Sequence, residues 1–192
     1  MRASESQRKH ITDELLRIRA IRNPCWRELA LDDLAMYVRS KPTRANRELL
    51  CLGAKSFAFD PWGLVRCRAC FIVGEFGAGK DLPMLKTMMR DPEWVVRSDA
   101  IDTFEEAATD RQLLYLWRIL EIEPHWLVRA DIATYLALRF GEPILDRLSC
   151  LLSKERSYPR RFGLLRAILV IRPEEVIDEF VTGLGHSDIG IQ

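Results

Sequence analysis

The chain lacks several features that would assign it at once to a functional class. No uninterrupted apolar stretch approaches the length of a membrane span, and the polar N-terminus, MRASESQRKHITDE, has no apolar signal-peptide core. We therefore expect a cytoplasmic protein with no membrane partner. The 29 Lys and Arg residues nearly balance the 28 Asp and Glu residues, so the formal net charge is +1. This balance removes the electrostatic signature of a dedicated nucleic-acid-binding protein.

Residue types that carry common catalytic and metal-binding chemistry are also few. The three histidines (His10, His125 and His186) have no Cys or Ser partner at a recognisable spacing, so no catalytic site is predicted. The five cysteines are odd in number, which argues against a disulfide framework. Cys67 and Cys70 form a C-x-x-C, but no second such pair follows at zinc spacing, and packing within a helix is favoured over a metal or redox site. We expect a non-enzymatic protein without a cofactor or metal.

What the chain does contain is a segment that recurs at a regular interval. Its four copies share a proline, an aromatic residue and a Val-Arg or Arg-Arg step: DPWGLVRCRA (60–69), DPEWVVRSDA (91–100), EPHWLVRADI (123–132) and SYPRRFGLLRA (157–167). The arginines of this step, whose spacing is constant to within one position, are Arg66, Arg97, Arg129 and Arg161. A fixed period of about 30 residues is typical of repeat architectures.

Two apolar series follow in the second half of each copy at the same spacing. They are Leu82, Leu113, Leu145 and Ile177, and, three residues later, Leu85, Leu116, Leu148 and Phe180. Apolar positions three residues apart share one face of a helix, so each copy is predicted to hold two helices. Such a pair cannot bury its apolar faces alone, and neighbouring pairs must stack into an all-α solenoid.

The segment VRCRACFIVGEFGAGKDLPMLKTMMRDPEWVVRSDA (65–100) resembles HEAT repeats of the short bacterial type, also called PBS-lyase HEAT-like repeats. The shared features are a D-P-x-x-x-V-R opening, a pair of small residues and a Leu-rich second helix. The resemblance implies a right-handed superhelix of stacked antiparallel helix pairs, forming a single α-solenoid domain over residues 1–192. Its recognisable repeats occupy 60–192, whereas 1–59 fit only as divergent N-terminal helices, over about 3–21, 25–38 and 43–54.

A nucleotide-binding signature also occurs, at GEFGAGKD (74–81). Gly74, Gly79 and Lys80 fit the P-loop pattern G-x-x-x-x-G-K-[ST], but Asp81 stands where a hydroxyl group would hold magnesium. In the register of the repeat, this segment is the turn between two helices, and a helix rather than a strand precedes it. The resemblance implies that these glycines close the first helix in left-handed conformations. We therefore predict no nucleotide partner.

The four evenly spaced arginines allow two interpretations. Guanidinium groups in a row could follow a nucleic-acid backbone. The resemblance instead implies a structural ladder, in which each arginine bonds to acidic groups and helix ends of the adjacent repeat. Asp99 and Asp131, two residues after Arg97 and Arg129, favour the ladder.

Second helices of HEAT-like repeats usually line the concave surface, which implies a protein partner there. The predicted contact residues, whose mixture of Arg, Tyr and Trp is typical of binding hot spots, are Lys86, Arg90, Tyr115, Trp117, Arg118 and Arg147. The preferred function is a protein–protein interaction module, such as an adaptor, regulator or inhibitor. The alternatives are an immunity protein that neutralises a bacterial toxin, a nucleic-acid-binding protein similar to alkylpurine DNA glycosylases, and a protein resembling bilin lyase subunits.

Overall fold

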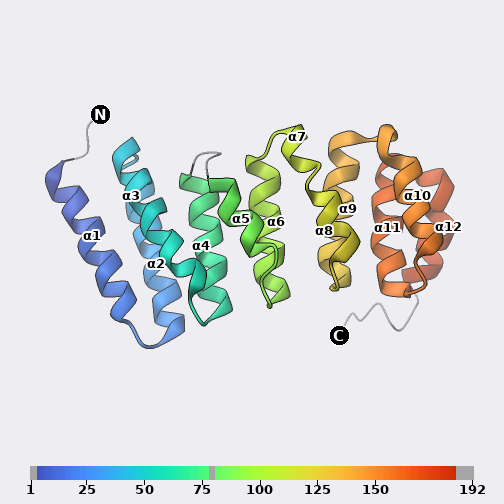
Figure 1. Cartoon of the computed structure of the whole chain (residues 1–192). Helices are drawn as coiled ribbons and strands as arrows, with labels where there is room; N and C mark the ends of the chain where they lie inside the picture. The colour runs from blue at the N-terminus through green and yellow to red at the C-terminus, as the bar shows by residue number, and fades with distance from the viewer. Residues whose placement is uncertain (1–3, 78–80, 185–192) are drawn as a thin grey trace. The chain divides into compact units, whose positions relative to one another are not determined.

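The computed structural model describes residues 4–77 and 81–184, and every regular element in these ranges is helical (Figure 1). The chain divides into two compact units, Met1–Ala108 (unit 1) and Thr109–Gln192 (unit 2). Helix pairs stack within each unit, which confirms the all-α solenoid class. The single continuous domain and its right-handed superhelix stay predictions. Each helix in the described part of the chain is too short or too polar to span a bilayer.

Unit 1 begins with three helices that lie close to the ranges predicted from the sequence. Its elements are α1 (Glu5–Ala20), α2 (Pro24–Ser40), α3 (Arg44–Ala54), the 3-10 helix η1 (Lys55–Phe59), α4 (Gly63–Phe76), α5 (Leu82–Met88) and α6 (Trp94–Ala107). The helices α2, α4 and α6 pack side by side in that order, while α3 packs on α4 and α5 packs on α6. α1 contacts α2 and α3.

Unit 2 continues the pattern with one interruption. Its elements are α7 (Asp110–Leu113), α8 (Leu116–Ile122), α9 (Trp126–Phe140), the 3-10 helix η3 (Glu142–Ile144), α10 (Leu145–Lys154), α11 (Tyr158–Ile171) and α12 (Pro173–Leu184). α11 packs against α9, α10 and α12, and α8 packs against α9. The sequence predicts one second helix where α7 and α8 lie. The helix is broken there because the backbone N–H groups of Tyr115 and Arg118 bond to carbonyls three residues earlier, which tightens the chain into a turn.

The two predicted apolar series supply much of the interior of both units. Six of their members are buried: Leu82, Leu85, Leu113, Leu116, Leu145 and Leu148. The last repeat departs from the pattern, because Ile177 is 47% exposed and Val176 is buried in its place. Phe180 nevertheless stacks on Phe162 of α11, with the ring centroids 4.7 Å apart.

Gly74 lies inside α4, which corrects the predicted helix boundary. The helix continues to Phe76 rather than ending at Val73. A Cβ atom on Gly74 would collide with the Thr103 side chain of α6, so the missing side chain allows α4 and α6 to approach closely. The glycine therefore serves helix packing and not a turn.

The remaining glycines of the predicted turn do not adopt left-handed conformations where they are described. Gly77 ends α4 with a φ of −76°, and its N–H donates to the Val73 carbonyl at 2.9 Å. Gly141 is the one described glycine with a positive φ, at 59°. Gly79 and Lys80 lie outside the described residues. Since α4 leads into this segment as a helix, the strand that a P-loop requires does not occur in the described part of the chain.

In unit 2, α11 lies unusually close to α9 at Gly163. A Cβ atom on Gly163 would stand 2.8 Å from the Ala130 Cβ and 2.9 Å from the Ala130 Cα. The second of these atoms belongs to the backbone of α9, so it cannot move aside by a side-chain rotation. Glycine and alanine at this crossing therefore set the separation of the two helices.

Candidate protein-binding surface

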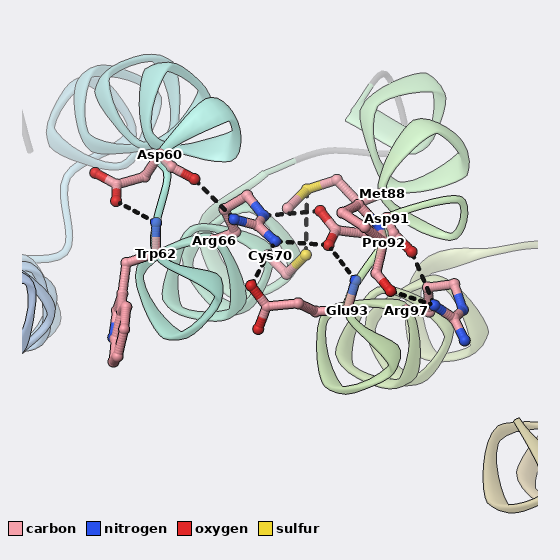
Figure 2. Close-up of polar contacts among 9 residues, drawn as sticks. All are labelled: Asp60, Trp62, Arg66, Cys70, Met88, Asp91, Pro92, Glu93 and Arg97. Atoms are coloured by element: carbon pink, nitrogen blue, oxygen red, sulfur yellow. Dashed lines mark hydrogen bonds and ion pairs between the residues drawn. The ribbon is translucent and has the colours of Figure 1, made fainter.

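Arg66 of α4 is a buried guanidinium that joins two loop segments of unit 1 (Figure 2). Its Nε and Nη2 donate to the two carboxylate oxygens of Asp91, each at 2.7 Å, and Nη2 also donates to Glu93 at 3.1 Å. Its Nη1 donates to the Asp60 carbonyl at 2.8 Å. The hydrogen bonds to Asp91 raise the pKa of Arg66, which keeps the buried group charged. This two-pronged contact fixes the orientation of the carboxylate as well as its distance.

The other arginines of the predicted ladder bond to backbone carbonyls, either in a loop or at the end of a helix. Arg97 donates to two carbonyls in the loop before α6, at 2.9 and 3.1 Å. In unit 2, Arg129 donates to the Leu120 carbonyl in the last turn of α8, and Arg161 donates to the Leu152 carbonyl of α10 at 2.8 Å. The last carbonyls of a helix have no partner within it and carry partial negative charge, so a guanidinium is favourable there.

One acidic residue at a repeat opening joins two successive ladder arginines. Asp91 accepts from Arg66 through its carboxylate and from Arg97 through its backbone carbonyl. Glu155 binds both ladder arginines of unit 2 in the same two ways, with its carboxylate 3.5 Å from one and its carbonyl 3.2 Å from the other. The linking acids therefore occupy the repeat opening, whereas Asp131, which the sequence suggested, bonds to Arg166 at 2.6 Å.

The same arrangement extends to an arginine that the sequence reasoning missed. Asp60 gives its carbonyl to Arg66, and its carboxylate lies 3.1 Å from the Nε of Arg27 in α2. The interval from Arg27 to Arg66 is longer than the interval between successive ladder arginines, because η1 lengthens this repeat. A search at a fixed period passes over Arg27, although its acidic partner opens the first recognisable copy.

Burial of the ladder guanidinium groups bears on the nucleic-acid interpretation. Arg66, Arg97 and Arg129 are all buried, and burial lowers the pKa of Arg129. A phosphate backbone is bound by cations that reach solvent. The described contacts direct these groups inward, which disfavours phosphate tracking by the row.

Of the two predicted contact residues in unit 1, Arg90 reaches solvent, whereas Lys86 contacts an aromatic ring. The Lys86 Nζ lies 5.7 Å from the centroid of the Phe104 ring, in a cation–π contact with α6. Arg90 follows α5 and is exposed. Arg90 is therefore the better placed of the two to meet a partner.

In unit 2 the predicted residues divide in the same way. Trp117 is only 4% exposed, so its indole ring belongs to the interior and departs from the prediction of a contact residue. The Arg147 guanidinium covers it, 4.1 Å from the ring centroid, and donates to Glu121 at 2.9 Å. Arg118 is exposed and Tyr115 is half-buried. Arg118 and Arg147 are therefore the outward arginines of α8 and α10, and Arg147 rests on the buried Trp117 ring.

The histidines have structural neighbours. The ring of His10 stands edge-on to Tyr37, with centroids 4.5 Å apart, and His125 lies beside Trp126. His186 is outside the described residues. Within the described ranges, no group of three or more His, Cys, Asp or Glu side chains could hold a metal ion.

The comparison with protein families agrees with this ladder of helix pairs. Residues 56–137 match the family model for HEAT repeats. This stretch of the chain consists of HEAT repeats. HEAT repeats commonly mediate protein–protein interaction. No curated protein matches the chain.

The HEAT-repeat segment opens beside a groove that the sequence reasoning did not find. This groove lies between η1 and α5 and has a volume of about 430 Å³. Its lining includes Lys55, Phe59, Met84, Thr87, Met88 and Arg90. The sequence feature that could have indicated the groove is the triplet Phe57-Ala58-Phe59. Its 3-10 geometry buries Phe57 and leaves Phe59 82% exposed.

The cysteine pair of the first HEAT repeat lies in the core. Cys67 and Cys70 are buried on α4, and the Cys70 Sγ lies 3.2 Å from the Met88 Sδ (Figure 2). Burial raises the pKa of both thiols well above the ordinary range, and the nearby Asp99 carboxylate adds to the effect. The thiolate is the reactive form of cysteine, so these two groups are inert.

We expect iodoacetamide at pH 8 to label Cys25 and Cys150, which are exposed, and to modify Cys67 and Cys70 about 100-fold more slowly. Peptide mapping by mass spectrometry measures the four rates. In guanidinium chloride all four thiols should react alike, which serves as the control. Equal labelling of Cys67 and Cys25 in the native protein would contradict the buried placement.

The raised pKa of the two buried thiols also predicts how stability depends on pH. The unfolded thiols ionise near a pKa of about 8.5 and the folded ones do not, so the stability of unit 1 should fall as the pH rises above that value.

Proposed function

We propose that this HEAT-repeat protein is a non-enzymatic protein-binding module, which holds its partner on the faces of its second helices. The observation that carries the proposal is that the arginines fall into two groups, one directed inward and one directed to solvent. The arginines that open the first helices bond inward to backbone carbonyls and acidic side chains. Arg90 just after α5, Arg118 on α8 and Arg147 on α10 instead reach solvent. Exposed arginines beside apolar groups are enriched at binding hot spots.

Exposed apolar side chains support a binding surface in each unit. Leu52 and Phe59 in unit 1 are 67% and 82% exposed, and Leu114 and Ile122 flank α8 in unit 2. Isolated exposed apolar residues are normal, but Leu52 lines a cavity with Arg47, and Phe59 lines a groove with Arg90. The proposal covers an adaptor, a regulator or an inhibitor, including an immunity protein. A partner that is toxic alone and harmless when coexpressed with this chain would establish the inhibitor version.

A nucleic-acid partner is the weaker alternative. Three of the four ladder arginines that first suggested it are buried, and the net charge is +1. A protein similar to alkylpurine DNA glycosylases would need a basic surface built from other residues. Duplex binding whose affinity falls steeply with salt concentration would favour this alternative.

The proposal is tested by charge reversal on the second helices. We expect Arg90→Glu together with Arg118→Glu to reduce recovery of a specific partner from native lysate at least tenfold, because each arginine is exposed and is not needed for folding. Quantitative mass spectrometry of affinity-purified material measures the recovery. The matched control is Arg8→Glu on α1, also exposed, which should leave the partner bound. Equal recovery with all variants would contradict this placement of the surface.

A further inference from the structure

The groove between η1 and α5 has an apolar floor and one prominent wall. Ala58, Met84 and Met88 supply aliphatic and thioether groups, and Phe59 projects with 82% of its surface exposed. Methionine side chains adapt to differently shaped apolar groups. At about 430 Å³, the groove has room for one or two apolar side chains of a partner.

The charged groups around this groove are unequally paired. Asp91 lines it, but its carboxylate is held by Arg66. Lys55 also lines it and is paired with the buried Asp81, whose hydrogen bond raises the pKa of Lys55. No ion pair joins Arg90 to any residue in the described ranges. Arg90 is therefore the uncompensated charge of the groove, and it is positive.

A second cavity adjoins the groove, and it too is lined by an exposed apolar side chain and an arginine without an acidic partner among the described residues. It has a volume of about 840 Å³ and shares Lys55 with the groove. Its lining includes Leu52, which is 67% exposed, and Arg47, for which the described residues likewise provide no acidic partner. Its other exposed arginine, Arg44, is paired with Glu48. The two cavities together present an apolar side chain and an unpaired guanidinium twice, on α3 and at the η1–α5 groove.

We propose that this surface binds a short acidic segment of a partner protein, which inserts an apolar side chain beside Phe59 and sets a carboxylate against Arg90. A second carboxylate of the same segment meets Arg47. The inference rests on the proposed protein-binding function and specifies the chemistry of the partner. A peptide is favoured over a nucleic acid because the floor is made of flexible aliphatic groups, and a phosphate backbone would need a longer row of unpaired cations.

The test selects ligands from a phage-displayed library of short random peptides against the full chain. The enriched sequences should combine a leucine or an aromatic residue with at least two Asp or Glu residues. Synthetic fluorescein-labelled copies are then titrated by fluorescence anisotropy. We expect Phe59→Ser and Arg90→Glu each to weaken binding at least tenfold. Both side chains are exposed, so circular dichroism should show unchanged helicity.

The matched controls are Phe71→Ser, another exposed phenylalanine of unit 1, and Arg8→Glu. Both should bind the selected peptides as the native chain does. Enrichment of basic or uncharged peptides, or tighter binding of single-stranded DNA at the same site, would overturn the inference. Peptides lost with Arg118→Glu but insensitive to Phe59→Ser would overturn it and leave the protein-binding function standing. A selection that enriches nothing would count against both.

Discussion

Arg66→Ala is expected to lower the free energy of unfolding of unit 1 by about 3–5 kcal/mol. The side chains of Arg66 and Asp91 are each about nine-tenths buried, so the substitution leaves a carboxylate away from water without its cation. It also removes the donor to the Asp60 carbonyl. Breaking a buried pair costs more than the pair contributes, because the remaining charge keeps its full desolvation penalty.

Urea unfolding followed by circular dichroism measures the loss, and hydrogen exchange in α4 and α6 locates it in unit 1. Arg47→Ala, at an exposed arginine of the same unit, is the control and should change stability by less than about 0.5 kcal/mol. Asp91→Asn added to Arg66→Ala should destabilise less than the sum of the two single changes, since the stranded charge is gone. A loss below about 1 kcal/mol for Arg66→Ala would show that the guanidinium is not needed to hold the loops together.

Gly163→Val is expected to destabilise unit 2 by about 3 kcal/mol. Even the first added carbon would stand 2.9 Å from the Ala130 Cα, so α9 and α11 must move apart. This movement disturbs the packing of Leu164, Leu165 and Ile168, which are buried. The valine side chain is also branched at Cβ, which lowers its preference for a helix.

Gly63→Ala provides the comparison, since it also adds a carbon at a close contact. There the obstructing group is the Glu93 carboxylate, the end of a flexible and half-exposed side chain that can rotate away. We expect a change within about 1 kcal/mol. Thermal unfolding, with hydrogen exchange in α9 and α11, distinguishes the two variants. Equal effects of both substitutions would be inconsistent with the close backbone approach at Gly163.

The sequence predicted the fold well because the repeated apolar positions lie within single helices, whose buried face follows from local spacing. The spacing of the leucine series required a buried face on each second helix, and Leu85, Leu116 and Leu148 are buried. The errors lie where one residue type serves two purposes. Gly74 could end a helix or admit a neighbouring helix, and only the position of Thr103 decides between them.

The surface was harder to predict than the core. Trp117 is three residues before Leu120 on α8, so the two side chains share a buried helix face. This spacing explains the burial of Trp117 better than the frequent occurrence of tryptophan in interfaces does. Phe59 has the opposite outcome, because a short 3-10 helix turns it outward. The periodicity of an α-helix does not describe such a segment.

The acidic residue at a repeat opening binds one arginine through its carboxylate and the next through its carbonyl, and this arrangement affects how the number of repeats can change. Asp60 and Asp91 each hold the preceding arginine by the side chain and the following arginine by the backbone. Duplication of the block 60–90 would therefore create a junction in which every guanidinium finds the same two acceptors. The interval from arginine to acid is not fixed, because it is one residue longer for Arg129 and Glu155 than for Arg66 and Asp91, and the link is made in both. Growth by complete blocks is thus a route that leaves each arginine with both acceptors, while the loops absorb small differences in length.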